Sequence, residues 1–392
     1  MVKIIAICLC FLVGRALATW LTQEAAELIT RQFLLDETAR SKIQFRGTDL
    51  RTSTPFVSGD GFRHHCAHVC DETNRCRMHP ETVQNGSCIF VKADFYQFFV
   101  ESVIPRIPGT YKIVSHNGDL SCPDGQTDAG RIQMSKYLTS NLLEHEYQRG
   151  RLLAHHGQNL WWRNVTQGAP RPPWAHCLPI GIENRQYAVG KHPQAYASAL
   201  QENIINKKVM STEEMSNRQL LLVAFYPKSR VPDRLKVLVA LGAYAKDGKM
   251  PKVTNPWYNL TDLSHKEWLD AIPLHRFVLA PFGHGLDTHR VTEILLMGGV
   301  PVMRRSTISS CYDDSDNIWK AGNSTKTRGS LPVVILDSWA DLTKERLEKE
   351  WTRIVQVPST KWDWSRLVIS HWISRIDGTA YTSQTETIKG LS

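Results

Sequence analysis

Residues 277–303 carry a group of side chains that is suited to binding a phosphorylated ligand. The segment combines flexible backbone with imidazole, guanidinium and carboxylate groups, carried by Gly283, His284, Gly285, Arg290 and Glu293. Glycines let a backbone approach a ligand closely, and a guanidinium group and the N–H groups at a helix N-terminus both attract negative charge. The spacing of Arg290 and Glu293 puts them on one helix face near its first turn.

The residues around this group predict a strand, a loop, a helix and a second strand. The apolar run 277–280 suits a buried strand, and Pro281 with the two glycines interrupts it. Asp287 and Thr288 are candidate N-caps, and Gly298 with Gly299 ends the helix before the next apolar run. In a parallel sheet, such a loop lies at the carboxyl edge of the strands, where open α/β folds bind their ligands.

The composition is that of a globular protein with a basic surface. The chain has 392 residues, of which 42% are hydrophobic and 22% charged, and its formal net charge is +9. This length allows two domains of ordinary size. The positive charge favours an anionic ligand, such as a nucleotide diphosphate or an acidic polysaccharide.

The N-terminus predicts entry into the secretory pathway. Residues 1–18 combine Lys3, an apolar run of about ten residues and the small-residue sequence Ala16–Ala18, which is the pattern of a signal peptide. The run is short of the roughly 20 residues that span a bilayer, although an uncleaved membrane anchor is the alternative. We therefore expect a protein of the Golgi or endoplasmic reticulum lumen, or a secreted one, with no nucleic-acid partner.

The cysteines fit an oxidising compartment. Two of the nine belong to the predicted signal, and the other seven are Cys66, Cys70, Cys76, Cys88, Cys122, Cys177 and Cys311. We expect disulfides with one thiol left over, because the spacing of the first four matches none of the usual zinc patterns. Four glycosylation sequons, at Asn85, Asn164, Asn259 and Asn323, agree with secretion.

Strands alternate with helices in two consecutive series, which predicts an α/β protein with two Rossmann-like domains that face a cleft. We expect an N-terminal domain over 19–205 with a Cys-rich loop, a C-terminal domain over 206–375, and a polar tail over 376–392.

The C-terminal series resembles the exostosin family of glycosyltransferases over residues 218–355. The resemblance rests on a Phe-x-Leu-x-Pro-x-Gly pattern, a later Arg and Glu, and Gly-x-Pro-Val. These residues are Phe277, Leu279, Pro281, Gly283, Arg290, Glu293, Gly299, Pro301 and Val302. Leu331–Pro332, Asp337–Trp339 and Arg234 extend the similarity, whereas the first half resembles the family only loosely. The resemblance implies a GT-B architecture, a nucleotide-sugar co-substrate held by the C-terminal half, and inverting transfer with no metal and no cofactor.

Such a transfer needs cations for the departing diphosphate. The candidates are Lys228, Arg230, Arg234 and Arg290, with the loop residues Gly283, His284 and Gly285. Glu293 is placed to accept hydrogen bonds from ribose. The structural alternatives are an ion pair for Arg290, a helix-dipole contact for Glu293 and a solvated His284.

The acceptor hydroxyl needs a base from the N-terminal half. His116 and Asp119 follow a predicted strand and are the candidates, although Asn117-Gly118-Asp119 is also a common turn sequence. Glu183 and Arg185, after another predicted strand at 177–182, are the alternatives.

The sequence therefore predicts an inverting glycosyltransferase that moves a sugar from a nucleotide-sugar donor to a glycan or glycoprotein acceptor. The alternative is a secreted carbohydrate-binding or interaction protein on an inactive transferase scaffold. An epimerase is disfavoured, because no Gly-x-Gly-x-x-Gly pattern is present.

Overall fold

The protein was analysed as a computed structural model. It describes residues 53–124, 139–162, 165, 168–184, 193–201, 217–225, 232–243, 257–313, 330–357 and 361–379. The predicted signal peptide, residues 19–51, Lys228, Arg230, Arg185 and the sequons at Asn164 and Asn323 lie outside these residues.

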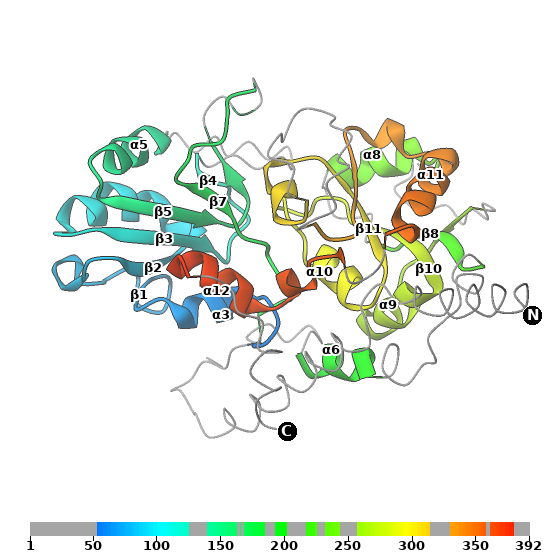
Figure 1. Cartoon of the computed structure of the whole chain (residues 1–392), viewed down its shortest axis with the longest axis horizontal. Helices are drawn as coiled ribbons and strands as arrows, with labels where there is room; N and C mark the ends of the chain where they lie inside the picture. The colour runs from blue at the N-terminus through cyan, green and yellow to red at the C-terminus, as the bar shows by residue number, and fades with distance from the viewer. Residues whose placement is uncertain are drawn as a thin grey trace, which may run out of the picture.

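Two parallel five-stranded sheets form the centres of the two halves of the molecule, seen at the left and right of Figure 1. In the N-terminal sheet the strands follow chain order: β1 (His68–Cys70), β2 (Ser87–Lys92), β3 (Tyr111–His116), β5 (Leu152–Gly157) and β7 (Ala175–Cys177). A short parallel pair, β4 (Cys122–Pro123) and β6 (Leu160–Trp161), lies beside it. The α/β prediction with two Rossmann-like halves is confirmed.

The C-terminal sheet has the order β12-β11-β10-β8-β9. Its strands are β8 (Gln219–Val223), β9 (Tyr258–Leu260), β10 (His275–Leu279), β11 (Val300–Arg304) and β12 (Val334–Leu336). The chain leaves β8 toward one edge and then returns to the other side of β8 at β10. The strand order therefore reverses between these two strands, and such a point is where open α/β sheets bind ligands.

Short helices cover both sheets. Around the N-terminal sheet these are α3 (Gly59–His65), η1 (Pro80–Thr82), η2 (Ala93–Phe95), α4 (Tyr96–Phe98), η3 (Phe99–Val103), η4 (Ile104–Arg106) and α5 (Ser140–Gln148). The later ones are α6 (Pro193–Leu200), α8 (Pro232–Ala240), α9 (His265–Ala271), η7 (Ile272–Leu274), α10 (His289–Leu296), η8 (Thr307–Cys311), η9 (Trp339–Asp341), α11 (Lys344–Val355), η11 (Trp364–Leu367) and α12 (Ile369–Asp377). No helix among the described residues is both long and apolar enough to cross a membrane.

Two helices pack on the half of the molecule that their place in the chain would not suggest. The last one, α12, returns to the N-terminal half and packs on α3, as Figure 1 shows in red and blue. In contrast, α6 packs on α9 and α10 of the C-terminal half. The core of the C-terminal half thus includes residues 193–200, which precede the boundary expected from the sequence.

One predicted strand differs in the structure. We expected a strand at 177–182, but β7 ends at Cys177 and the following residues form a loop. Gly181 has a positive φ of 72°, and a Cβ there would lie 2.0 Å from the Val57 carbonyl oxygen. Pro179 and Gly181 therefore turn the chain away from the sheet and toward the other half.

The disulfide prediction is confirmed for six of the seven cysteines. The pairs are Cys66–Cys88, Cys70–Cys76 and Cys177–Cys311, and Cys122 is a buried free thiol. The third pair links β7 to η8 and so connects the two halves covalently. Within the described part of the chain, no three His, Cys, Asp or Glu side chains are grouped as metal ligands.

Candidate functional site

The predicted strand, loop, helix and strand at 277–303 are present as β10, its loop, α10 and β11. Thr288 is the N-cap residue, with extended backbone, but its side chain makes no cap hydrogen bond. Its N–H instead donates to the Asp287 carboxylate at 2.8 Å. The loop and the N-terminus of α10 therefore lie at the carboxyl edge of the sheet, as the sequence predicts.

Arg290 reaches the place where the strand order reverses. It stands on the first turn of α10, which follows β10, and its Nη1 donates to the carbonyl oxygen of Ala224, the residue after β8. Its guanidinium lies over the Trp268 ring, 4.5 Å from the ring centre. The stacking and the carbonyl contact fix the cation between the ends of β8 and β10.

Arg234, on the first turns of α8, approaches the same place from the other side. Its Nη2 lies 3.9 Å from the position that a Cβ on Gly283 would occupy. The neighbouring Asp233 anchors α8 there, because it accepts hydrogen bonds from Phe282 N at 3.0 Å and from Arg304 Nε at 2.8 Å. Gly283 thus leaves open the space beside the Arg234 guanidinium.

The positive charges of Arg234 and Arg290 are both partly buried and repel each other. Burial, and then the charge of Arg290, lowers the pKa of Arg234 to about 10. Burial also lowers the pKa of Arg290, although the nearby Glu293 carboxylate opposes this. A bound anion would offset both the desolvation and the mutual repulsion, so the arrangement suits a diphosphate.

Glu293 turns into the core instead of toward the loop. It is 2% exposed, and its two carboxylate oxygens accept hydrogen bonds from Tyr196 Oη and Trp268 Nε1, each at 2.8 Å. These contacts favour a structural role, the alternative that the sequence left open, since a ribose would have to displace one of them. His284 is exposed at the tip of the loop.

Of the two predicted bases, His116 is buried. It is the last residue of β3, it is 2% exposed, and the ring of Phe62 lies 5.2 Å away. Its ring nitrogens contact Asn117 Oδ1 at 3.0 Å and the Pro179 carbonyl oxygen at 3.2 Å. Burial lowers the pKa of His116 to about 4. The position therefore fits a structural role better than proton transfer from an acceptor.

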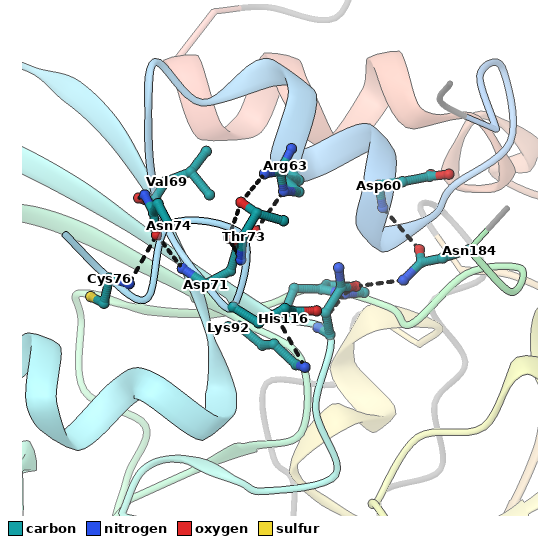
Figure 2. A network of polar contacts seen from close by, with 12 residues as sticks. Asp60, Arg63, Val69, Asp71, Thr73, Asn74, Cys76, Lys92, His116 and Asn184 are labelled. Atoms are coloured by element: carbon teal, nitrogen blue, oxygen red, sulfur yellow. Dashed lines mark hydrogen bonds and ion pairs between the residues drawn. The ribbon is translucent and has the colours of Figure 1, made fainter. Parts of the chain in front are cut away.

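A chain of hydrogen bonds holds this end of β3 in place. Asn117 Oδ1 accepts from Asn184 Nδ2 at 3.0 Å, and Asn184 Oδ1 accepts from the N–H of Asp60 at 2.9 Å, as Figure 2 shows beside His116. Asn117 has a positive φ of 59°, which asparagine tolerates better than most residues. The network joins α3, β3 and the loop after β7, and it fixes the loop that begins at Asn117.

Asp119 lies on that loop and is exposed. The carbonyl oxygen of the adjacent Gly118 accepts from Asn159 Nδ2 at 3.1 Å, and Asn159 Oδ1 accepts from the N–H of Asp287 at 2.8 Å. One asparagine therefore connects the loop of the predicted base to the loop of the predicted donor site. Asp119 keeps the solvent access that a base for an incoming acceptor needs.

Glu183 also contacts the C-terminal half, which carries the predicted donor site. Its carboxylate lies 3.4 Å from His289 Nε2 on the first turn of α10, and His289 Nδ1 contacts the Gly181 carbonyl oxygen at 2.8 Å. Glu183 is thus a second carboxylate close to the contact between the two halves. The structure does not describe Arg185, the other alternative.

Sequence reasoning missed Asn159 and Asp233, which position the site. Neither belongs to a recognisable motif. The one available signal was the place of Asn159 directly after the β5 segment, at the carboxyl edge of the expected sheet.

Comparison with known proteins finds distantly similar solved structures but no match in sequence. No protein-family model matches the chain, so the resemblance to the exostosin family is not confirmed in that way, and no curated protein sequence matches it. Among solved structures, the apo structure of OtsA aligns with 77% of this chain and 74% of its own, at 12% identity and a TM-score of 0.34. A structure described as "Trehalose-6-phosphate from E. coli bound with UDP-2-fluoro glucose" aligns with 76% and 74%, at 13% identity and a TM-score of 0.35. No residue role is transferred at this level of similarity.

Proposed function

We propose that the protein is an inverting glycosyltransferase that uses a nucleotide-sugar donor and a glycan or glycoprotein acceptor in the secretory pathway. One observation carries the proposal: two partly buried arginines, Arg234 and Arg290, meet at the strand-order reversal of a parallel sheet, beside a glycine loop and a helix N-terminus. Nucleotide diphosphates are bound at such places by guanidinium groups and backbone N–H groups.

The donor diphosphate would lie between Arg234 and Arg290, over Gly283. During transfer, negative charge grows on this diphosphate, and fixed guanidinium groups stabilise that charge without having to reorganise. Lys228 and Arg230, which lie just before α8 in the chain, are proposed to add to this charge. The transfer would need neither a metal nor a cofactor, because these cations take the role of a Lewis acid.

The acceptor hydroxyl would lose its proton to Asp119. This carboxylate is exposed, and the Gly118–Asn159–Asp287 contacts hold its loop against the donor loop. Proton removal from one side and departure of the diphosphate from the other are what direct displacement at an anomeric carbon requires. Such a displacement inverts the configuration.

The experiment that tests the proposal is a calorimetric titration of the purified chain with UDP-sugars and GDP-sugars. We expect one class to bind, and Arg290→Gln to weaken that binding about 10- to 100-fold, as the loss of a charge-assisted hydrogen bond does. Arg276→Gln is the matched control, because Arg276 also stacks on a tryptophan, Trp351, but near the start of β10. If no sugar nucleotide binds the wild-type protein, the proposal is wrong.

A further inference from the structure

A cavity lies in the N-terminal half, between the sheet and α12. Its volume is about 520 Å³. Strands β3, β5 and β7 form its floor, and η8 and α12 contribute its other walls. None of its lining residues belongs to the site around Arg234 and Arg290.

The cavity is lined by cationic side chains. Lys112, Arg171 and Arg375 come from three separate parts of the chain and meet at its walls, together with the imidazoles of His156 and His176. Among the described residues that line it, there is no aspartate or glutamate. The three cations, with no carboxylate among the described lining residues, make the potential in this concave site positive, which attracts anions.

Hydrogen bonds to neutral oxygen atoms hold two of these side chains at the cavity wall. Lys112 Nζ donates to the carbonyl oxygen of Asp377 at 3.1 Å, whereas the carboxylate of Asp377 contacts His65 at 2.9 Å. Arg171 Nη1 donates to Ser310 Oγ at 3.4 Å. These contacts place both cationic groups beside the cavity.

The two histidines form a stacked pair in the floor. The ring centres of His156 and His176 are 5.0 Å apart, and the rings are inclined by 28°. Burial lowers the pKa of both side chains, and the neighbouring cations lower it further. Near neutral pH the imidazoles are therefore uncharged, and each keeps one N–H that can donate to a ligand oxygen.

The remaining walls are apolar. Leu153, Ala154 and Ile376 line the cavity, and Leu153 is 42% exposed. The volume is within the range of small-molecule sites and exceeds what a bare ion fills. The lining thus suits a molecule with a carbon skeleton and an anionic substituent.

We propose that this cavity binds a small ligand that carries a phosphate, sulfate or carboxylate group on a sugar-sized skeleton. The anionic group would lie between Lys112, Arg171 and Arg375, and the skeleton would lie against Leu153 and Ile376. The proposal rests on a different site from the donor site and does not depend on the glycosyltransferase activity.

The bound ligand would also connect the two halves. Lys112 and the histidines belong to the N-terminal sheet, whereas Ser310 in η8 and Arg375 in α12 belong to segments that follow the C-terminal sheet strands β11 and β12. These residues come together only in the folded protein, so a ligand that contacts all of them binds the folded state and not the unfolded one. Binding should therefore raise the melting temperature.

Four hexoses that differ only at C6 test the proposal: glucose 6-phosphate, glucose 6-sulfate, glucuronate and glucose. Each is titrated into the full-length protein, by calorimetry and by thermal shift, at concentrations up to the millimolar range. We expect at least one anionic hexose to bind and to raise the melting temperature, and we expect glucose to do neither. The anionic hexose that binds best identifies the substituent.

Two variants and two controls locate the binding. Lys112→Gln and Arg375→Gln, made separately, should each weaken it about tenfold or more. Arg353→Gln, which removes an arginine of α11 that pairs with Glu350 outside the cavity, should not. Arg290→Gln should also leave it unchanged, which separates this site from the donor site. The proposal fails if no anionic hexose binds, if glucose binds equally well, or if both cavity variants bind as the wild type does.

Discussion

The side chain of Asn159 binds the backbone of Asp287 and so joins the two halves of the molecule. Its Oδ1 accepts from the Asp287 N–H at 2.8 Å, and its Nδ2 donates to the Gly118 carbonyl oxygen at 3.1 Å. Asn159 is fully buried and has a positive φ of 51°. The loop that carries Asp119 and the loop that precedes α10 are therefore held in a fixed relation by one residue.

We predict that removing this side chain destabilises the protein. Asn159→Gly and Asn159→Ala each leave the buried Asp287 N–H without its acceptor, which costs about 1–3 kcal/mol in the free energy of unfolding. Alanine should lose roughly 1–2 kcal/mol more, because its Cβ is disfavoured at positive φ. Urea unfolding followed by tryptophan fluorescence measures both losses. A glycine variant as stable as the wild type would show that the hydrogen bonds contribute nothing.

Two nearby glycines should respond differently to alanine. A Cβ on Gly285 would lie 2.4 Å from Asn159 Nδ2, whereas a Cβ on Gly283 would meet only Arg234 Nη2, at 3.9 Å. Gly285→Ala should therefore cost about 1–3 kcal/mol of stability through overpacking, and Gly283→Ala less than about 0.5 kcal/mol. Thermal unfolding compares the two.

The double variant checks the cause of that difference. If the Gly285→Ala cost arises from the clash with Asn159, then combining it with Asn159→Gly should be less destabilising than the sum of the single variants. Strict additivity, or equal costs for the two alanine variants, would contradict this explanation.

The elements around the site were predictable because their signals are local. The apolar run, the loop glycines and the Thr288 N-cap lie within residues 277–303, and the structure has β10, α10 and β11 there. Of the cations named from the sequence, Arg234 lies beside Gly283, and Arg290 contacts Ala224 at the end of β8. Local patterns of this kind depend little on the rest of the fold.

The roles of single polar residues were less predictable, because their partners are distant in the chain. Glu293 is bound by Tyr196, which is 97 residues away, and His116 contacts Pro179, which is 63 residues away. Both side chains look like exposed site residues in the sequence, and tertiary packing buries them. Asn159 belongs to no motif, and only its place after the β5 segment pointed to the site, since its partners belong to two other loops.

The free energy of unfolding should depend on pH in part through the titration of Asp287. Burial raises the pKa of this carboxyl to about 6, although hydrogen bonds from Ile180 N, Thr288 N and Tyr312 Oη and the charge of His289 oppose the rise. The unfolded value is about 3.9, so between these values the folded state binds more protons. The contribution of Asp287 to stability is therefore complete below about pH 4 and is lost as the pH rises through 6.

We test this with Asp287→Asn, which does not titrate. The difference in the free energy of unfolding, wild type minus variant, should fall by about 2–3 kcal/mol between pH 4 and pH 7, from two pKa units at about 1.4 kcal/mol each. Urea unfolding at pH 4, 5, 6 and 7 gives the difference at each point, and other groups cancel in it. A difference that is constant or rises with pH would contradict the raised pKa.

The exposure of Asp119 and the burial of His116 lead to opposite predictions for catalysis. With the sugar nucleotide that binds best, Asp119→Asn should lower the transfer rate by about 10²- to 10⁴-fold, as expected for the loss of a general base, and leave donor affinity unchanged. His116→Gln, which removes a buried imidazole, should lower stability more than the transfer rate. Release of the nucleotide measures the rate, and calorimetry measures donor binding.

Glu183→Gln completes this test, because Glu183 is the other carboxylate near the donor half, 3.4 Å from His289. If Glu183→Gln abolishes transfer and Asp119→Asn does not, the base is Glu183, since both variants keep the shape of the side chain and remove its negative charge and its ability to take a proton. If the wild-type protein binds donor and acceptor yet transfers nothing, neither carboxylate acts as a base, and the protein is a carbohydrate-binding protein on a transferase scaffold. A loss of transfer confined to Asp119→Asn would instead assign the proton transfer to the loop that Asn159 holds against the donor site.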